Sequence, residues 1–337
     1  MVNSSSVNSR YTQESNFEQA INHQIAELWQ QRNDGYIKSS DKKSLYWCSL
    51  TSASHTKAIV VVNGRIESAW KYQELFYDLY QQGYDIYSFD HRGQGLSDRL
   101  IDDKQMGYVD EFDDYLVDLV AMVDHFKLGH YQKRYLLAHS MGGAIATRYL
   151  ETTPQHSFDA IALSAPMYGI NVAWYLRPIA MGLSQLLTEV HATPNYAPGH
   201  KAYYAKPFKD SLLTQSAIRY HWFRDLYEKK PELKLGGPST RWVWQGLMAA
   251  KQCIQQTRQI HIPLLLLQAG NDQIVSNTAQ ETFFTKLNKT NHCSQMIRVT
   301  GSKHELLFEQ DRYRNQTLDA LFNFLKTIND EIRKSTT

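Results

Sequence analysis

The sequence predicts an α/β fold with a doubly wound, mostly parallel β-sheet, helices on both of its faces and an inserted helical cap. Short apolar runs typical of buried strands, such as 58–62 and 262–268, alternate with segments of helical periodicity. This alternation favours a parallel sheet, because parallel strands need crossover connections that helices supply. The cap is predicted from one unusually long interval between two strands. Roughly 95 residues separate the strand ending near Ser164 from the one starting near Ile262, whereas a crossover needs about a dozen.

The predicted elements follow one another in a regular order. Strands are expected where apolar and β-branched residues cluster between turn signals, at 44–50, 57–62, 84–90, 135–138, 158–164, 262–268 and 295–299. Helices are expected where apolar residues recur every three or four positions, at 72–80, 108–126, from about Gly142 onward, and at 311–328. Gly83 follows the first helix and fits its C-terminal end.

The long interval divides the chain into four parts. Residues 1–18 are rich in Ser and Asn, and we expect them to form a mobile tail. The core is predicted to comprise residues 19–165 and 259–330, with the helical cap at 166–258. Because α/β sheets bind ligands at the carboxyl ends of their strands, an insertion there is expected to cover the active site.

Composition excludes several classes of protein. The 36 Lys and Arg against 34 Asp and Glu leave a net charge of +2, so no nucleic-acid partner is expected. The three cysteines lie far apart without a C-x-x-C pair, which disfavours a zinc ribbon or a disulfide framework and fits a reducing compartment. No metal and no cofactor are predicted. The N-terminus lacks a secretory apolar core, and no apolar run reaches the ~18 residues of a spanning helix.

A serine stands where a strand turns sharply into a helix. The stretch YLLAHSMGGA at 135–144 places Ser140 between Ala138 and Gly142, which matches the nucleophile elbow G-x-S-x-G with Ala138 in the first glycine position. The small neighbours allow strand and helix to approach, and the hydroxyl then lies at a helix N-terminus that favours a developing anion. Ser140 is therefore the predicted nucleophile.

A serine hydroxyl needs a base, and the base needs a carboxylate to orient it. In folds with this elbow, the acid and then the histidine follow the serine in the chain. Asp272 follows the predicted strand 262–268, and His304 follows the last strand, 295–299. Both loops lie at the same sheet edge as Ser140. We predict that Asp272 orients His304, which acts as general base and then as general acid.

Two backbone N–H groups are expected to stabilise the oxyanion. One is that of Met141, the residue after the nucleophile, and the other is that of Arg65 in the loop after the strand 57–62. Gly64 allows the substrate to approach this backbone closely. The side chain of Arg65 is free to meet a phosphate separately.

Five motifs follow one another along the chain: GRIES at 64–68, DHRGQGLS at 90–97, the serine elbow, GGPS at 236–239 and HELLFE at 304–309. Together they resemble the bacterial lysophospholipase family, which is similar to monoacylglycerol lipases within the α/β-hydrolase superfamily. The resemblance spans about residues 45–324. It implies an α/β-hydrolase fold, hydrolysis of the single acyl ester of a lysophospholipid, and peripheral attachment to the cytoplasmic side of the inner membrane. Ser140 and His304 carry over directly onto the family's motif.

Several alternatives stay open at this stage. The same three residues fit a monoacylglycerol lipase, a thioesterase, another carboxylesterase or a peptidase, because pocket shape rather than the triad sets the substrate. Acyl transfer to another lipid alcohol differs only in the acceptor, and a non-catalytic lipid-binding protein is a further alternative. The oligomeric state is not predicted.

Three residues of the insertion are candidates for contact with the substrate. Trp174 and Leu176 either pack within the cap or line an acyl-chain channel or membrane-facing patch. Arg241 either holds the cap in place or faces the phosphate of the substrate. The segment 92–95 is interpreted as a structural turn, with Asp90 and Arg92 bonding to loop backbone.

Overall fold

The computed structural model describes residues 10–171 and 194–335 and is built around an eight-stranded sheet in the order β1-β2-β4-β3-β5-β6-β7-β8. β2 pairs antiparallel with β1 and β4, and every other pair is parallel. The strands are β1 (Asn33–Lys38), β2 (Ser44–Leu50), β3 (Lys57–Val62), β4 (Tyr84–Phe89), β5 (Lys133–His139), β6 (Ala160–Ser164), β7 (Leu264–Ala269) and β8 (Gln295–Val299). The predicted fold class is confirmed.

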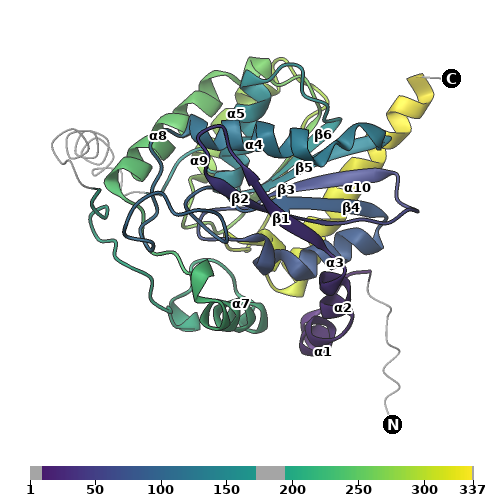
Figure 1. The fold of residues 1–337 in the computed structure, drawn as a ribbon. Helices are drawn as coiled ribbons and strands as arrows, with labels where there is room; N and C mark the ends of the chain where they lie inside the picture. The colour runs from purple at the N-terminus through teal and green to yellow at the C-terminus, as the bar shows by residue number, and fades with distance from the viewer. Residues whose placement is uncertain (1–9, 172–193, 336–337) are drawn as a thin grey trace, which may run out of the picture.

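Helices cover both faces of this sheet (Figure 1). One layer consists of α4 (Asp113–Phe126), α5 (Met141–Thr152), α8 (Thr240–Gln255) and α9 (Asn277–Leu287), which contact one another in that order. The other layer contains α3 (Gln73–Gln81) and α10 (Asp311–Ser335). β4, β6 and β7 are buried along their whole length between the two layers, which explains the mostly apolar sequences of β6 and β7.

The sequence does not predict β1, and the reason is its position. β1 is an edge strand with the polar sequence NDGYIK, and all its residues are exposed or half-buried. A strand without a buried face carries no alternation of apolar and polar residues, so its pairing with β2 is specified by backbone hydrogen bonds.

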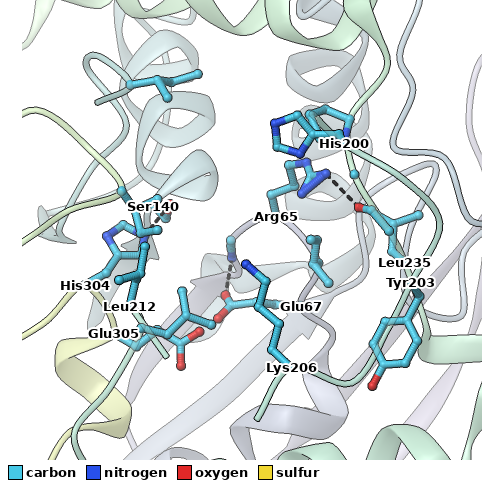
Figure 2. A pocket seen from close by; sticks show the side chains of 18 of the residues that line it. Arg65, Glu67, Ser140, His200, Tyr203, Lys206, Leu212, Leu235, His304 and Glu305 are labelled. Carbon is cyan, nitrogen blue, oxygen red and sulfur yellow. Dashed lines mark hydrogen bonds between the residues drawn. The ribbon is translucent and has the colours of Figure 1, made fainter. Parts of the chain in front are cut away.

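The insertion between β6 and β7 includes α7 (Ala217–Lys229) and α8. α8 packs against α5 and α9 in the helical layer of the sheet, so the predicted cap boundary at residue 258 is too late. The remainder of the described insertion reaches over the carboxyl ends of the strands, where it closes the cavity shown in Figure 2.

Within residues 10–171 and 194–335, no helix is long and apolar enough to span a bilayer.

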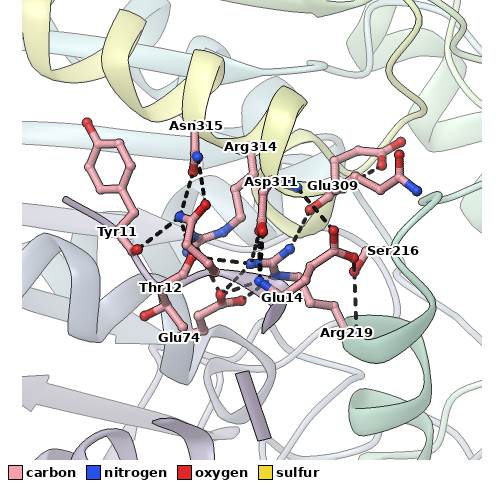
Figure 3. A network of polar contacts seen from close by, with 12 residues as sticks. Tyr11, Thr12, Glu14, Glu74, Ser216, Arg219, Glu309, Asp311, Arg314 and Asn315 are labelled. Atoms are coloured by element: carbon pink, nitrogen blue, oxygen red, sulfur yellow. Dashed lines mark hydrogen bonds and ion pairs between the residues drawn. The ribbon is translucent and has the colours of Figure 1, made fainter. Parts of the chain in front are cut away.

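The N-terminal segment packs against the body from Tyr11 onward. Tyr11 is 5% exposed and Phe17, the first residue of α1 (Phe17–Asn22), is 2% exposed. The Thr12 carbonyl accepts hydrogen bonds from the buried Arg219 and Arg314. Figure 3 shows the polar network to which these three residues belong. α2 (Gln24–Gln30) follows. The predicted mobile tail over 1–18 is therefore wrong for 11–18, because its polar composition conceals two aromatic anchors; residues 1–9 lie outside the described residues.

Candidate active site

The serine elbow has the strained geometry that its sequence predicts. Ser140 lies between β5 and α5 with φ +52°, a left-handed conformation that costs energy for a residue with a side chain. The next turn leaves no room for a side chain. A Cβ on Gly142 would lie 2.3 Å from the carbonyl oxygens of both Val62 and Asn63 at the end of β3. Only glycine at position 142 lets α5 start this close to β3.

Ser140, His304 and Asp272 come together at the carboxyl edge of the sheet. The distance from His304 Nε2 to Ser140 Oγ is 2.9 Å, and that from His304 Nδ1 to Asp272 Oδ2 is 2.7 Å. Figure 2 shows His304 beside Ser140 at one side of the cavity. The three residues follow β5, β7 and β8, so the parallel sheet brings together positions far apart in the sequence.

Asp272 is held as a carboxylate by its surroundings. Its Oδ1 accepts hydrogen bonds from the backbone N–H groups of Ile274 (2.8 Å) and Val275 (3.0 Å). Burial raises the pKa of Asp272, but the adjacent His304 and these two N–H groups outweigh burial and lower the pKa below its ordinary value. The carboxylate is therefore charged and oriented toward His304 Nδ1, which leaves Nε2 facing Ser140.

Two backbone N–H groups at the site are available to a ligand. Met141 is the first residue of α5, and Arg65 lies in the loop after β3. Within the described ranges, neither N–H donates to a protein acceptor. The adjacent loop is fixed by its neighbours, since Gly64 N–H donates to Glu67 Oε2 at 2.6 Å and Gln94 Nε2 donates to the Gly64 carbonyl at 2.8 Å.

A buried ion network connects this loop to the segment after His304. Lys71 Nζ lies 2.9 Å from Glu67 Oε1 and 2.6 Å from Glu305 Oε1, and all three side chains are at most 5% exposed. Burial raises the pKa of Glu67, but the Lys71 ammonium, His139 and the hydrogen bond from Tyr72 outweigh it and lower the pKa to about 2. Sequence reasoning misses this network, although GRIES and HELLFE contain both of its acids.

The turn after β4 supports the same loop. Asp90 accepts hydrogen bonds from the backbone N–H groups of Ala69 (2.7 Å) and Leu96 (2.8 Å), as predicted. Arg92 departs from the prediction that it bonds to loop backbone. It forms a bidentate pair with Asp118 of α4 at 2.6 and 2.7 Å, because a buried guanidinium requires a carboxylate.

A cavity of about 680 Å³ opens beside Ser140 and His304. Most of its apolar wall comes from the insertion, α8 included, with side chains such as Leu212, Leu213, Phe223, Leu235, Trp242 and Leu247. The predicted residue Gly64 lines the cavity, as do Arg65 and Ser140. The volume lies in the range of pockets that enclose a whole small molecule.

The predicted substrate contacts in the insertion have different outcomes. Trp174 and Leu176 lie outside the described residues. The prediction that Arg241 contacts the substrate is wrong, because its side chain bonds to the Asp110 carbonyl (2.7 Å) and to Glu111 (2.7 Å) and does not line the cavity. Arg241 instead joins α8 to the segment before α4. In the part of the chain that the structure describes, no group of His, Cys, Asp and Glu could hold a metal ion.

Comparison with known proteins places the chain among hydrolases. The family model for serine aminopeptidase S33 matches residues 53–311. The chain is 36% identical over 313 residues to lysophospholipase L2 of Escherichia coli strain K12, with 90% of this chain and 91% of that protein covered. It is 38% identical over 271 residues to the probable lysophospholipase L2 of Haemophilus influenzae, with 80% and 83% covered.

Solved structures agree on the fold. A soluble variant of monoglyceride lipase from Saccharomyces cerevisiae aligns with a TM-score of 0.68 at 16% identity, covering 88% of this chain and 96% of that one. A thermostable carboxyl esterase from Bacillus coagulans aligns with a TM-score of 0.68 at 14% identity, covering 88% and 98%. The chain therefore has the α/β-hydrolase fold and belongs to the serine aminopeptidase S33 family, in which it groups with the lysophospholipase L2 proteins.

Proposed function

We propose that this protein is a lysophospholipase that cleaves the single acyl ester of its substrate through an acyl-enzyme on Ser140. The observation that carries the proposal is the chain of hydrogen bonds from Asp272 through His304 to Ser140, at 2.7 and 2.9 Å. The family relationship to lysophospholipase L2 proteins supports the choice of substrate.

The geometry supports a two-step mechanism. Ser140 Oγ attacks the ester carbonyl as His304 Nε2 accepts its proton, while the charged Asp272 stabilises the imidazolium. The N–H groups of Arg65 and Met141 donate to the oxyanion. His304 then donates its proton to the leaving glycerophospho alcohol, and the acyl group stays on Ser140. In the second step His304 takes a proton from water, which attacks the acyl-enzyme, and returns that proton to Ser140 Oγ as the bond to the acyl group breaks and the fatty acid leaves.

The cavity wall supports a lipid substrate over a peptide. Its apolar side chains suit an acyl chain. An aminopeptidase must hold the free amino group of its substrate, and an unpaired carboxylate beside the serine would serve that purpose. Two of the three carboxylates that line the cavity, Glu67 and Glu305, are both bound to Lys71 instead. Monoacylglycerol is the second candidate substrate, since monoglyceride lipases are among the structural neighbours.

Peripheral contact with a membrane, on the cytoplasmic side of the inner membrane, is part of the proposal. The cavity is bordered by two exposed apolar side chains, Tyr204 (48% exposed) and Leu212 (40%). Lys201 and Lys206 lie against the Tyr204 ring, at 4.3 and 5.8 Å from its centroid. Apolar side chains flanked by cations suit a surface that contacts anionic lipids. Replacing Tyr204 and Leu212 with Ser should weaken co-sedimentation with anionic vesicles, and unchanged binding would contradict the contact.

Rates on four substrates test the proposed function. The purified protein is assayed on lysophosphatidylethanolamine, monoolein, acyl-coenzyme A and an aminoacyl anilide. We expect the highest kcat/KM on the lysophospholipid, and a loss of at least ~10⁴-fold in Ser140→Ala, the scale of triad deletions. A preference for the anilide, or near-normal turnover in Ser140→Ala, would contradict the proposal.

A further inference from the structure

The side chains that line the cavity include more cations than acids. The acids are Glu67, Asp210 and Glu305, and the cations are Arg65, Lys71, Lys201, Lys206 and Arg224. Lys71 is paired with both Glu67 and Glu305. Among the described residues, the other four cations form no ion pair. The cavity therefore carries an excess of positive charge, which favours a ligand with an anionic part.

Arg65 is the cation of this set that belongs to the loop beside Ser140. Its Nη2 donates to the Gly236 carbonyl at 2.8 Å, and its guanidinium stacks over the Trp242 ring at 5.0 Å. Its Nε is buried without an acceptor. A guanidinium has five N–H donors, so most of the hydrogen-bonding capacity of Arg65 is unused by the described residues. Burial lowers the pKa of Arg65 to about 10, which leaves the group charged at neutral pH.

The position of this guanidinium is set by the GGPS motif. A Cβ on Gly236 would lie 2.6 Å from the backbone nitrogen of Tyr203, so only glycine permits the tight backbone packing that holds the Gly236 carbonyl. That carbonyl anchors one edge of the guanidinium. Figure 2 shows Arg65 beside His200, on the far side of the cavity from Ser140 and His304. The side chain is thus held in place before any ligand binds.

We propose that the Arg65 side chain binds the phosphate of the head group, and that this contact selects lysophospholipid over monoacylglycerol. The inference rests on the proposed function and adds the residue that sets head-group specificity. When the ester carbonyl accepts a hydrogen bond from the backbone N–H of Arg65, the phosphate of the substrate lies one glycerol unit away from that N–H. The guanidinium of Arg65 lies one side-chain length away from the same N–H, so the phosphate and the guanidinium can meet. A phosphate there would pair with a charge that now lacks an anion. A monoacylglycerol offers only a hydroxyl at that end.

The selectivity between two substrates tests this role. kcat/KM is measured on lysophosphatidylethanolamine and on the monoacylglycerol with the same acyl chain, for the wild type, Arg65→Met and Arg65→Lys. We expect the ratio of the two values to fall about 10- to 100-fold in Arg65→Met, the usual effect of losing a hydrogen bond to a charged group. Arg65→Lys should give an intermediate ratio, since it keeps the charge without the planar fork. Arg241→Gln, a cation outside the cavity, is the matched control and should keep the wild-type ratio.

Equilibrium binding in the Ser140→Ala background separates this inference from the proposed function. We expect glycerophosphoethanolamine to bind more tightly than inorganic phosphate, and Arg65→Met to weaken its binding at least tenfold. If Arg65→Met lowers kcat/KM on both lipids but leaves their ratio unchanged, the inference is overturned. Arg65 would then serve only to connect the loop after β3 to the insertion. Equal affinity for both ligands would indicate a general phosphate site and also overturn it. A wild type that hydrolyses neither lipid would refute the proposed function, while binding still decides the role of Arg65.

Discussion

Replacing Lys71 with Met removes the cation that lies between two buried carboxylates. The ammonium is 2% exposed, contacts Glu67 and Glu305, and lies 4.4 Å from the ring centroids of both Phe223 and Phe308. Breaking a buried pair by removing one partner typically costs about 3–5 kcal/mol, because the remaining charge is left without compensation. Here two carboxylates are left facing each other, so we expect a loss of at least about 4 kcal/mol in the free energy of unfolding.

The same substitution is expected to slow catalysis. Glu67 holds the Gly64 N–H beside the predicted oxyanion donor, and Glu305 directly follows His304. A shift of either segment by about 1 Å would lower kcat by about 100-fold.

Urea unfolding followed by tryptophan fluorescence measures the stability effect, with kcat measured on the same preparations. Lys133→Met is the matched control, since Lys133 and Asp159 form a partly exposed pair that is expected to contribute less than about 1 kcal/mol. The double variant Lys71→Met with Glu305→Gln removes one of the stranded charges and should recover part of the loss. A Lys71→Met protein as stable as the Lys133→Met protein would show that Lys71 does not compensate the two buried carboxylates.

Three further predictions follow from buried groups. Burial lowers the pKa values of His91 and His139 to about 4, so stability from their neutral forms is complete above pH 6.5 and is lost as the pH falls through about 4. The neutral form of each histidine contributes about 3 kcal/mol to the free energy of unfolding. Urea unfolding measured between pH 6.5 and 4 should therefore show about half of this acid destabilisation in His91→Gln. An unchanged dependence of the unfolding free energy on pH would contradict the prediction. Gly142→Ala should cost at least about 2 kcal/mol of stability and most of the activity, whereas Gly129→Ala, whose Cβ meets no atom within 4 Å, should change stability by less than about 0.5 kcal/mol. Arg219→Met removes the closer of two cations at Glu74, which keeps Arg314 at 3.6 Å, and should speed proteolytic cleavage around α7; an unchanged digestion rate would show that the network in Figure 3 does not anchor this helix.

The sheet and its carboxyl edge could be predicted because their sequence signals are strong. Strands β3 and β7 are buried over almost their whole length and are therefore almost entirely apolar, and small residues mark the elbow around Ser140. Asp272 and His304 could be found because parallel strands deliver their following loops to one edge. The topology alone thus brings the three residues within reach of one another.

The rest depends on tertiary pairing that a single sequence does not display. β1 has no buried face, and Lys71 resembles a surface lysine until Glu305, distant in the chain, is seen beside it. The sequence leaves open whether Arg241 faces the phosphate or holds the cap in place, and only the structure shows that Glu111 binds it outside the cavity. Charged residues in particular cannot be assigned to surface or interior before their partners are known.

Covalent labelling of Ser140 tests whether His304 activates the serine hydroxyl as a nucleophile. The folded wild type is treated with a fluorophosphonate, and the modified residue and the rate are determined by peptide mass spectrometry alongside His304→Gln. We expect a single adduct on Ser140, formed at least about 100-fold more slowly in His304→Gln because the general base is missing. No adduct on the folded wild type, or equal labelling rates in the two proteins, would contradict this expectation.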